Sequence, residues 1–239
     1  YLDVIIETTG IFKELKQLET YQKLPQTKIV VTAPSNTLPM FVYGVNHDKY
    51  NNNNIISAAS CTTTCLAPIV DILHKEFFVR SGLATSIHSV TASQNAVDKY
   101  KLGSRTGRSL LNNIIPSSTG AAKSIGKIIP ELDGKLNAIS VRVPVQNVSL
   151  LDLTVELEDF PTIEDIRKAF LYHSKNKYNG IIDINSHELV SSDFIGNSHT
   201  SIVDYYGIMQ EGDLYKIMVW YDNEFGYVKN LLRMVQYMH

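Results

Sequence analysis

The sequence predicts an α/β protein in which a short parallel sheet is followed by a larger mixed or antiparallel sheet. Within the first 35 residues, an apolar run, a segment with helical spacing and a second apolar run follow one another. A strand–helix–strand order of this kind favours parallel strands. Later in the chain, long runs with partial alternation outnumber the helical segments, which is typical of a mixed or antiparallel sheet.

The first part of the chain supplies the short strands. Residues 2–7 indicate a buried strand that ends in a polar turn at residues 8–10, and residues 29–31 indicate a second buried strand. Between them, residues 11–24 place apolar side chains at helical spacing, which predicts a helix. A further apolar stretch at residues 54–57 leads into the segment SAASCTTTCLAP.

The second part begins with a helix after Cys61, because the apolar residues that follow recur at helical spacing. Pro68 lies within this helix, so we expect a kink or an irregular first turn. Two further helices are TIEDIRKAFLYHSK, for which Thr162 supplies a cap, and GYVKNLLRMVQYM. The strand-like runs of this part are GLATSIHSVTA, LNAISVRVPV, VSLLDLTVEL and YKIMVWYDN.

Composition and charge exclude several classes of protein. Apolar residues make up 44% of the 239 residues, which suits a packed core, and a formal charge of −2 provides no basic surface for nucleic acid. No apolar run reaches the roughly 18–20 residues of a membrane helix. Two cysteines four residues apart do not form a disulfide framework for a chain of this size, which favours a reducing, cytoplasmic location. The chain opens on a strand-like segment without an initiator Met, so we interpret it as a fragment that lacks its N-terminal part.

Cys61 falls where a strand ends and a helix begins, which is the setting of a reactive thiol. A helix N-terminus carries about half a positive charge, which favours the thiolate and lowers the pKa of a cysteine. Its free backbone N–H groups also bind an oxyanion or a phosphate. The alternative for Cys61 is a small buried core residue. A metal site is disfavoured, because the spacing to Cys65, which we interpret as structural, is not that of a CxxC pair.

A cysteine nucleophile needs a base, and seven histidines are available. All but one lie in polar loops, on charged helices or at the end of the chain. His88 differs, because it lies in the strand-like run TSIHSVTA, flanked by Ile87 and Val90. A histidine in that setting is either a satisfied core residue or the base that the nucleophile requires.

Five motifs of this chain resemble those of the glyceraldehyde-3-phosphate dehydrogenase family, in the family's order. They are SAASCTTTCLAP, SSTGAAKSIGKIIPELDGKL, VRVPVQNVSLLDL, VSSDF and WYDNEFGY. The segment VTAPSNTLPMFVYGVNHDKY is similar to the part of the family just upstream of the cysteine, so the resemblance covers essentially the whole chain. It implies an incomplete doubly wound, Rossmann-type nucleotide domain at residues 1–60 and 223–239, and an α+β catalytic domain at residues 61–222.

The resemblance also implies the chemistry of a phosphorylating, NAD(P)-dependent aldehyde dehydrogenase of glycolysis and gluconeogenesis. Cys61 would attack the aldehyde of a small phosphorylated substrate, and His88 would take the proton and steady the oxyanion. Hydride would pass to NAD or NADP, and inorganic phosphate would cleave the resulting thioester to an acyl phosphate. Covalent capture of this kind divides one difficult oxidation into two easier steps.

Two anion sites follow from the same resemblance, because the substrate and the attacking group are both phosphates. Thr91 and Arg142 would bind the substrate phosphate, for which Arg142 offers a charged fork. Hydroxyl and backbone N–H donors suit the attacking phosphate. Its site would consist of Ser60, Thr62, Thr119 and Gly120.

The cofactor would lie against residues that match the family's nucleotide site, namely Thr9, Gly10, Thr32 and Asn223. No residue matches a metal ligand. None of the 13 glycines forms a GxGxxG motif, so we expect the glycine-rich turn for the pyrophosphate and the acidic residue for the ribose to lie upstream of residue 1.

The chain departs from the commonest form of the family's signature at Ala58 and Thr64, where the family has Asn. The nearest rival in substrate is an erythrose-4-phosphate dehydrogenase, a close relative with the same chemistry. A rival of another class is a non-catalytic, degenerate relative that acts as an interaction module. The resemblance implies a homotetramer for the full-length enzyme, in which the SSTGAAK loop reaches toward a neighbouring cofactor site.

Overall fold

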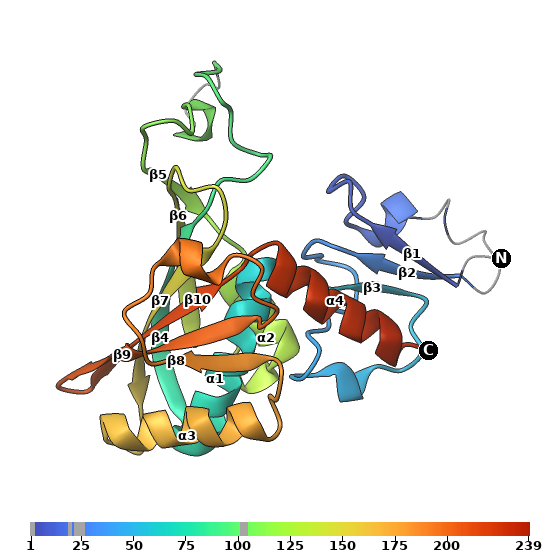
Figure 1. Cartoon of the computed structure of the whole chain (residues 1–239). Coiled ribbons are helices and arrows are strands. Elements are labelled where there is room, and N and C mark those ends of the chain that lie inside the picture. Colours follow the sequence, from blue (N-terminus) through green and yellow to red (C-terminus); the bar gives the residue numbers. More distant parts are fainter. Residues whose placement is uncertain (1–2, 19–20, 22–26, 101–104) are drawn as a thin grey trace.

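The computed structural model describes residues 3–18, 21, 27–100 and 105–239 (Figure 1). Within these residues, three parallel strands form a small sheet in the order β1-β2-β3. Seven described strands form a large, mixed sheet in the order β5-β6-β4-β7-β10-β9-β8. The prediction of an α/β fold that combines a short parallel sheet with a larger mixed sheet is therefore confirmed.

The strands of the small sheet are β1 (Val4–Glu7), β2 (Lys28–Val31) and β3 (Ile55–Ser57). The strands of the large sheet are β4 (Val79–His88), β5 (Ile115–Ser118), β6 (Leu136–Arg142), β7 (Ser149–Leu157), β8 (Ile182–Asn185), β9 (Ser201–Glu211) and β10 (Leu214–Tyr221). The α-helices of the described residues are α1 (Cys61–Phe77), α2 (Ala121–Ile128), α3 (Ile163–Lys175) and α4 (Phe225–Tyr237).

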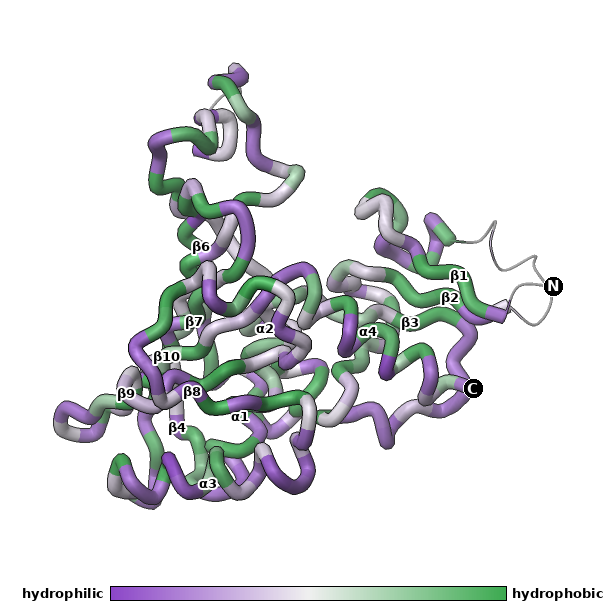
Figure 2. The backbone as a smooth tube through the Cα atoms, viewed as in Figure 1, coloured by the Kyte–Doolittle hydropathy of each residue, from purple (hydrophilic) through white to green (hydrophobic). Residues whose placement is uncertain are grey.

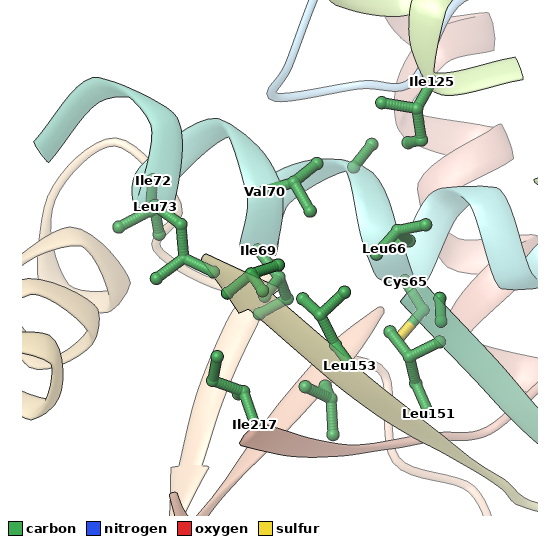
Figure 3. Close-up of a cluster of buried hydrophobic side chains, with 14 of the residues drawn as sticks. Cys65, Leu66, Ile69, Val70, Ile72, Leu73, Ile125, Leu151, Leu153 and Ile217 are labelled. Carbon is green, nitrogen blue, oxygen red and sulfur yellow. The ribbon is translucent and has the colours of Figure 1, made fainter. Parts of the chain in front are cut away.

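The main core lies between α1 and the large sheet. Residues 62–73 of α1 are all buried, and β7 alternates buried with half-buried residues along its whole length. Figure 3 shows Leu66 and Ile69 of α1 beside Leu151 and Leu153 of β7 in this core. Full burial of one such side chain is worth about 1.5–3 kcal/mol, so the packing holds α1 firmly against the sheet.

The last helix, α4, packs on the small sheet although it lies at the other end of the chain (Figure 1). Leu231 and Met234 of α4 join Val30 of β2 in one buried cluster. Asn230 also accepts from the backbone N–H of Tyr43 and donates to its carbonyl, each at 3.1 Å. Figure 2 shows apolar residues along β1–β3 and an alternation of polar and apolar residues along α4, which is the pattern of a helix that covers a sheet.

The helix boundaries follow the expected capping chemistry. Thr162 Oγ1 accepts from the N–H of Asp165 at 3.2 Å, and Asp165 accepts from the N–H of Thr162 at 3.0 Å, which is a capping box. α1 runs without interruption through Pro68, and its first turn is regular because the Ser60 hydroxyl caps it. The irregular first turn expected from Pro68 is therefore not found. None of the described helices is long and apolar enough to cross a bilayer.

The helix expected over residues 11–24 is wrong for the part that the structure describes. Before residue 19, only Leu15–Leu18 is helical, as a 3₁₀ turn. The carboxylate of Glu14 instead accepts hydrogen bonds from the backbone N–H groups of Asn36 and Thr37. Bonds from side chains to the backbone compete with a helix. The rest of that segment, except residue 21, lies outside the described residues, as does residue 2 of the expected first strand.

Four further elements, β5, β8, β9 and α2, have no clear signal in the sequence. Three of these are short, and the long strand β9 contains Gly207, which weakens its strand pattern. A Cβ atom at Gly207 would lie 2.8 Å from Cβ of Met218 in the neighbouring strand, so only glycine fits there. The pairing of β9 with β10 also shifts register between Ile217 and Val219, next to this close approach.

A buried carboxylate joins α1 to the chain that follows α3. Asp71 is 5% exposed, and its Oδ2 accepts from Lys75 Nζ at 2.8 Å, from Lys177 Nζ at 2.9 Å and from the Tyr178 hydroxyl. Burial opposes the ionisation of Asp71, but these three donors outweigh it and hold the pKa of Asp71 below its ordinary value. The ionised carboxylate therefore stabilises the folded state.

We predict that Asp71→Ala lowers the free energy of unfolding by about 3–5 kcal/mol, because the ammonium of Lys177 and the hydroxyl of Tyr178 lose their acceptor. Lys75→Ala is the control, since its side chain is 54% exposed. We expect the control to lose less than about 1 kcal/mol. Urea unfolding at pH 7 measures both changes.

The same carboxylate gives the stability a defined pH dependence. Because the pKa of Asp71 is lower in the folded than in the unfolded state, its contribution is fully present above the unfolded value of about 3.9. The contribution is lost as the pH falls through the folded value. Asp71→Asn should therefore flatten the acid limb of a stability–pH curve, and an unchanged acid limb would contradict this role.

Candidate active site

Two neighbouring strands of the large sheet end side by side at the candidate site. β4 and β6 are parallel, and their register pairs His88 with Arg142 at the carboxyl ends of both strands. α1 begins at Cys61, shortly after β3 ends at Ser57. As a result, the sulfur of Cys61 lies 3.4 Å from Nε2 of His88. The structure thus brings together the two residues to which the sequence assigned the chemistry.

A short, strained connection between β3 and α1 presents Cys61. Ala59 has a φ of 60°, in the left-handed region that a residue with a Cβ rarely adopts. The Ser57 hydroxyl accepts from the N–H of Ala59 at 3.1 Å, and the Tyr227 hydroxyl donates to its carbonyl at 3.2 Å. Strain of this kind persists only where the surroundings enforce it, and it concentrates at functional sites.

The ring of His88 is held on several sides. Its Nδ1 lies 2.8 Å from the carbonyl oxygen of Ser89 and 2.6 Å from Nη1 of Arg142. Tyr221 packs edge-on against the ring, with the centroids 6.0 Å apart. The side chain is 3% exposed, so these contacts replace water and keep Nε2 directed at Cys61.

Burial sets the protonation of the pair. It raises the pKa of the Cys61 thiol, although the N–H and hydroxyl of Thr62 and the charge of Arg142 act in the opposite direction. Burial, followed by the charge of Arg142, lowers the pKa of His88 to about 4. The expectation of a lowered pKa for Cys61 is therefore wrong, because the loss of hydration outweighs the helix terminus. At neutral pH the pair is a thiol beside a neutral imidazole.

Of the two residues predicted to bind the substrate phosphate, Arg142 has an unused donor. Its Nη1 contacts His88 and also donates to the Ser89 carbonyl at 3.3 Å, whereas its Nε is buried and has no partner among the described residues. An unpaired guanidinium N–H is suited to an oxyanion. Thr91 is engaged in its own turn, where its N–H and hydroxyl donate to Gln94 Oε1 at 2.8 and 2.9 Å.

The residues predicted to bind the attacking phosphate lie at the starts of two helices. Ser60 and Thr62 lie at the start of α1, where Ser60 is the cap. Thr119 and Gly120 precede α2, where Gly120 lines a small cavity with lysines of that helix. No hydrogen bond of the described residues joins the two pairs, so their common site stays a prediction.

The carboxyl edge of the small sheet carries most of the residues predicted to bind the cofactor. Thr9 and Gly10 follow β1, Thr32 follows β2, and the same edge leads through β3 to Cys61. Ligands of open parallel sheets bind outside this edge. Thr9 and Thr32 both donate hydroxyl hydrogen bonds to Glu7, so they shape the turns. Gly10, with a φ of 70° and no atom within 4 Å of a built Cβ, leaves room for a ligand.

Asn223 fits the recognition of a carboxamide near the reacting pair. It follows β10 and is 5% exposed. The hydroxyls of Ser89 and Ser149 donate to its Oδ1 at 2.9 and 3.0 Å. These bonds fix the plane of the amide and leave its NH₂ group to donate to a ligand. Asn223 and the residues at the carboxyl edge of the small sheet therefore fit an NAD-type cofactor.

A network of hydroxyl groups, not expected from the sequence, lies behind Cys61 and His88. The Tyr221 hydroxyl lies 3.1 Å from Thr62 Oγ1 and 2.8 Å from Ser86 Oγ. Burial raises the pKa of Tyr221, so the phenol stays neutral and acts by hydrogen bonding. A strand period of two would have found Ser86, because it shares a face of β4 with His88.

The two positions at which the chain departs from the commonest family signature make ordinary structural contacts. The hydroxyl of Thr64 donates to the carbonyl of Ser60 at 2.9 Å, and Ala58 packs in the cluster beneath α4. At these two departures from the commonest signature, Ala58 thus packs in a core cluster and Thr64 bonds back to the backbone of the first turn of α1. Across the described ranges, no group of three His, Cys, Asp or Glu side chains could hold a metal ion.

Together, the fold and the site fit the class of dehydrogenases that pair a cysteine with a nicotinamide nucleotide. Comparison with known proteins agrees with this class. The family described as "Glyceraldehyde 3-phosphate dehydrogenase, C-terminal domain" matches residues 60–223. The chain belongs to the glyceraldehyde-3-phosphate dehydrogenase family, a family of NAD-dependent oxidoreductases of glycolysis.

Three similar proteins illustrate the relationship. The chain is 45% identical over 239 residues to "Glyceraldehyde-3-phosphate dehydrogenase 1" of Kluyveromyces lactis. The aligned region covers 99% of the chain and 73% of that protein. It is 44% identical over 240 residues to the protein of the same name from Saccharomyces cerevisiae, with 99% and 72% covered. It is 45% identical over 237 residues to "Glyceraldehyde-3-phosphate dehydrogenase" of Phytophthora infestans, with 98% and 71% covered.

We predict that iodoacetamide labels Cys61 much faster than Cys65 in the folded protein. Cys61 is partly exposed at the start of α1, whereas Cys65 is fully buried and burial raises its pKa strongly. Because the pKa of Cys61 is also raised, its labelling should keep accelerating as the pH rises above neutral.

Mass spectrometry of partly alkylated protein measures both labelling rates. Protein unfolded in urea is the control, since both cysteines should then react alike. Equal labelling in the folded state, or a Cys61 rate that levels off below pH 7, would contradict this account of the site.

Proposed function

We propose that this chain oxidises glyceraldehyde 3-phosphate to an acyl phosphate, with Cys61 as nucleophile, His88 as base and NAD or NADP as hydride acceptor. The observation that carries the proposal is the 3.4 Å contact between the sulfur of Cys61 and Nε2 of His88 at the start of a buried helix. The substrate is supported by the names of the relatives, which are glyceraldehyde-3-phosphate dehydrogenases.

In the first step, the sulfur of Cys61 adds to the aldehyde carbon while its proton passes to Nε2 of His88. The new C–S bond displaces the carbonyl electron pair onto oxygen. The N–H groups of Cys61 and Thr62 open α1 and have no acceptor within the helix, so they donate to that oxygen as its charge develops. His88 then returns the proton to the oxygen and completes the hemithioacetal.

In the second step, His88 removes the hydroxyl proton as hydride leaves the carbon, and a thioester remains on Cys61. The chemistry that an NAD-type cofactor supplies when bound is the acceptance of this hydride. Asn223, whose Oδ1 is fixed by Ser89 and Ser149, would hold the carboxamide of that cofactor through its NH₂ group. Inorganic phosphate then breaks the C–S bond to release the acyl phosphate, and the sulfur regains its proton from His88.

The two phosphates require separate anion sites, and the structure supports them unequally. The unpaired Nε of Arg142 beside His88 supports a site for the substrate phosphate, with Thr91 in the loop after β4. The positive end of α1, together with the hydroxyls of Ser60 and Thr62 there, supports the site of the attacking phosphate. Its proposed members are Ser60, Thr62, Thr119 and Gly120.

We predict that His88→Ala lowers kcat by on the order of 10²–10⁴ and changes KM little, since a positioned base contributes about that factor. His187→Ala is the matched control, because it removes an exposed imidazole and should leave both constants unchanged. Steady-state kinetics of the full-length protein measure both variants. An unchanged kcat in His88→Ala would remove His88 from the mechanism.

We predict that Arg142→Ala reduces kcat/KM for glyceraldehyde 3-phosphate much more than for unphosphorylated glyceraldehyde. The lost interaction is charge-assisted and partly buried, so a loss of roughly tenfold or more is expected for the phosphorylated substrate. Arg80→Ala, at the exposed far end of β4, is the control. Equal losses for both substrates would assign Arg142 to the fold instead.

The two rival functions lack support from a specific residue. A non-catalytic interaction module would not require an imidazole in contact with a thiol. This chain has that contact between His88, which is buried, and Cys61, which is partly exposed. The names of the relatives favour glyceraldehyde 3-phosphate over erythrose 4-phosphate. Comparison of kcat/KM for the two sugar phosphates tests that choice.

We also propose that the protein assembles as a homotetramer. The described part of residues 89–114 projects from the large sheet (Figure 1). Exposed apolar side chains lose unfavourable contact with water when a partner covers them. Those in the projection are Val97, Tyr100, Leu111 and Ile114.

We predict that Ile114→Ser shifts the assembly toward smaller species, because it removes apolar area from this projection. Tyr172→Ser is the control, since it changes an exposed ring on α3. Sedimentation equilibrium measures the mass of each protein, and a monomeric wild type would contradict the proposed assembly.

A further inference from the structure

The loop that follows β2, residues 33–38, binds a carboxylate from another part of the chain. The carboxylate of Glu14 accepts from the backbone N–H groups of Asn36 and Thr37 at 3.2 and 3.1 Å. The hydroxyls of Ser35 and Thr37 donate to it at 3.0 and 2.7 Å. The Thr37 hydroxyl first, and then the N–H of Asn36 and the other donors, lower the pKa of Glu14 to about 2 although burial acts in the opposite direction. Glu14 is therefore ionised at neutral pH.

The ammonium of Lys127, on α2, binds the other side of the same peptide groups. It donates to the carbonyl oxygens of Ser35 and Asn36 at 2.8 and 3.2 Å. Two consecutive peptide groups, those that join Ser35 to Asn36 and Asn36 to Thr37, thus lie between the ammonium and the carboxylate of Glu14. Hydrogen bonds in such a chain polarise and strengthen one another. Neither Glu14 nor Lys127 has an ion pair within the part of the chain that the structure describes, so the two charges act on each other through these peptide groups.

The carboxylate comes from a segment that is predicted to bind the cofactor. Glu14 lies shortly after Gly10, at the carboxyl edge of the small sheet, and the N–H of Leu15 donates to the hydroxyl of Thr37 at 2.9 Å. The loop after β2 itself begins next to Thr32, another residue predicted to bind the cofactor. The two segments at this edge are therefore bonded to each other as one unit.

The same loop is bonded to the catalytic side of the site. α2, which carries Lys127, begins directly after Gly120 of the proposed phosphate site. A cavity of about 230 Å³ lies between the loop and α2, and Gly120 contributes to its lining. The hydroxyl of Ser57 donates to the carbonyl of Ala33 at 2.6 Å and accepts from the N–H of Ala59, in the connection that presents the nucleophile.

We propose that Glu14 and Lys127 form a bridged pair, acting through the two peptide groups between them, that holds the cofactor edge and the phosphate site in one arrangement around Cys61. Both are positioning residues, because each acts through the loop after β2. The inference rests on the proposed function, which places the cofactor at the edge of the small sheet and the attacking phosphate at the starts of α1 and α2. Loss of either charge then loosens both sites, including the site on the far side of the loop.

A double-mutant cycle tests whether the two charges act as a pair. Glu14→Gln keeps the shape of the side chain and replaces one acceptor oxygen with a donor, and Lys127→Met removes the ammonium and keeps the apolar stem. Urea unfolding of the full-length protein at pH 7 measures the wild type, both single variants and the double variant. We expect the double variant to lose less stability than the sum of the two single losses. Additive losses would overturn the bridged pair.

Binding of NAD tests whether the pair reaches the cofactor edge. Isothermal titration of the full-length protein with NAD should show weaker binding, by about fivefold or more, in both Glu14→Gln and Lys127→Met. The controls are Glu164→Gln and Lys168→Met, which exchange exposed charged residues of α3 and should bind NAD like the wild type. Unchanged binding in Lys127→Met would overturn the proposal, because Lys127 would then act on α2 alone.

Steady-state kinetics separate this inference from the function itself. The KM for inorganic phosphate should rise in both variants, whereas the KM for glyceraldehyde 3-phosphate should stay, since no hydrogen bond of the described residues joins Arg142 or Thr91 to the loop after β2. A higher KM for phosphate in Lys127→Met alone refutes the bridged pair and keeps the function. A wild type that does not oxidise glyceraldehyde 3-phosphate refutes the function, and the unfolding cycle then still decides whether the pair exists.

Discussion

The parallel pairing of β4 with β6 is the constraint on which the site depends. Parallel strands place their carboxyl ends at one edge of a sheet, and the register of this pair puts His88 beside Arg142 at that edge. The packing of α1 against β7 then brings the first residue of the helix, Cys61, to the same place. A slip of one residue in the register would turn His88 to the opposite face of the sheet and remove its contact with Cys61.

Burial fixes the positions of the side chains in the site and also sets their protonation. The contacts that exclude water from His88 hold its ring still, and they make the charged form of the imidazole and of the thiolate unfavourable. The neutral thiol of this pair reacts with electrophiles far more slowly than a thiolate does. In the proposed reaction, the proton of the Cys61 thiol would therefore move to His88 during the attack on the aldehyde.

Much of the fold could be predicted from the sequence, because many elements have a strong period. The alternation of β7 and the helical spacing of α1 indicate their elements and the faces that they bury. The segment around Glu14 has helical apolar spacing but forms no α-helix in its described part, because the carboxylate of Glu14 binds the backbone of a distant loop. Short elements such as β5 and α2 give too few periods to be found, and β9 is interrupted by Gly207.

The sequence by itself indicated Cys61 and His88 as the candidate pair, since a cysteine at a helix start and a histidine in an apolar strand stand out locally, and the family motifs link them. Only the tertiary structure decided the protonation of Cys61 and His88 and the partners of Arg142. Protonation depends on how much water each group loses and which charges face it, and those groups come from elements distant in the chain. A sequence pattern records the spacing of residues along one element, whereas desolvation and shared hydrogen bonds exist only once several elements have packed together.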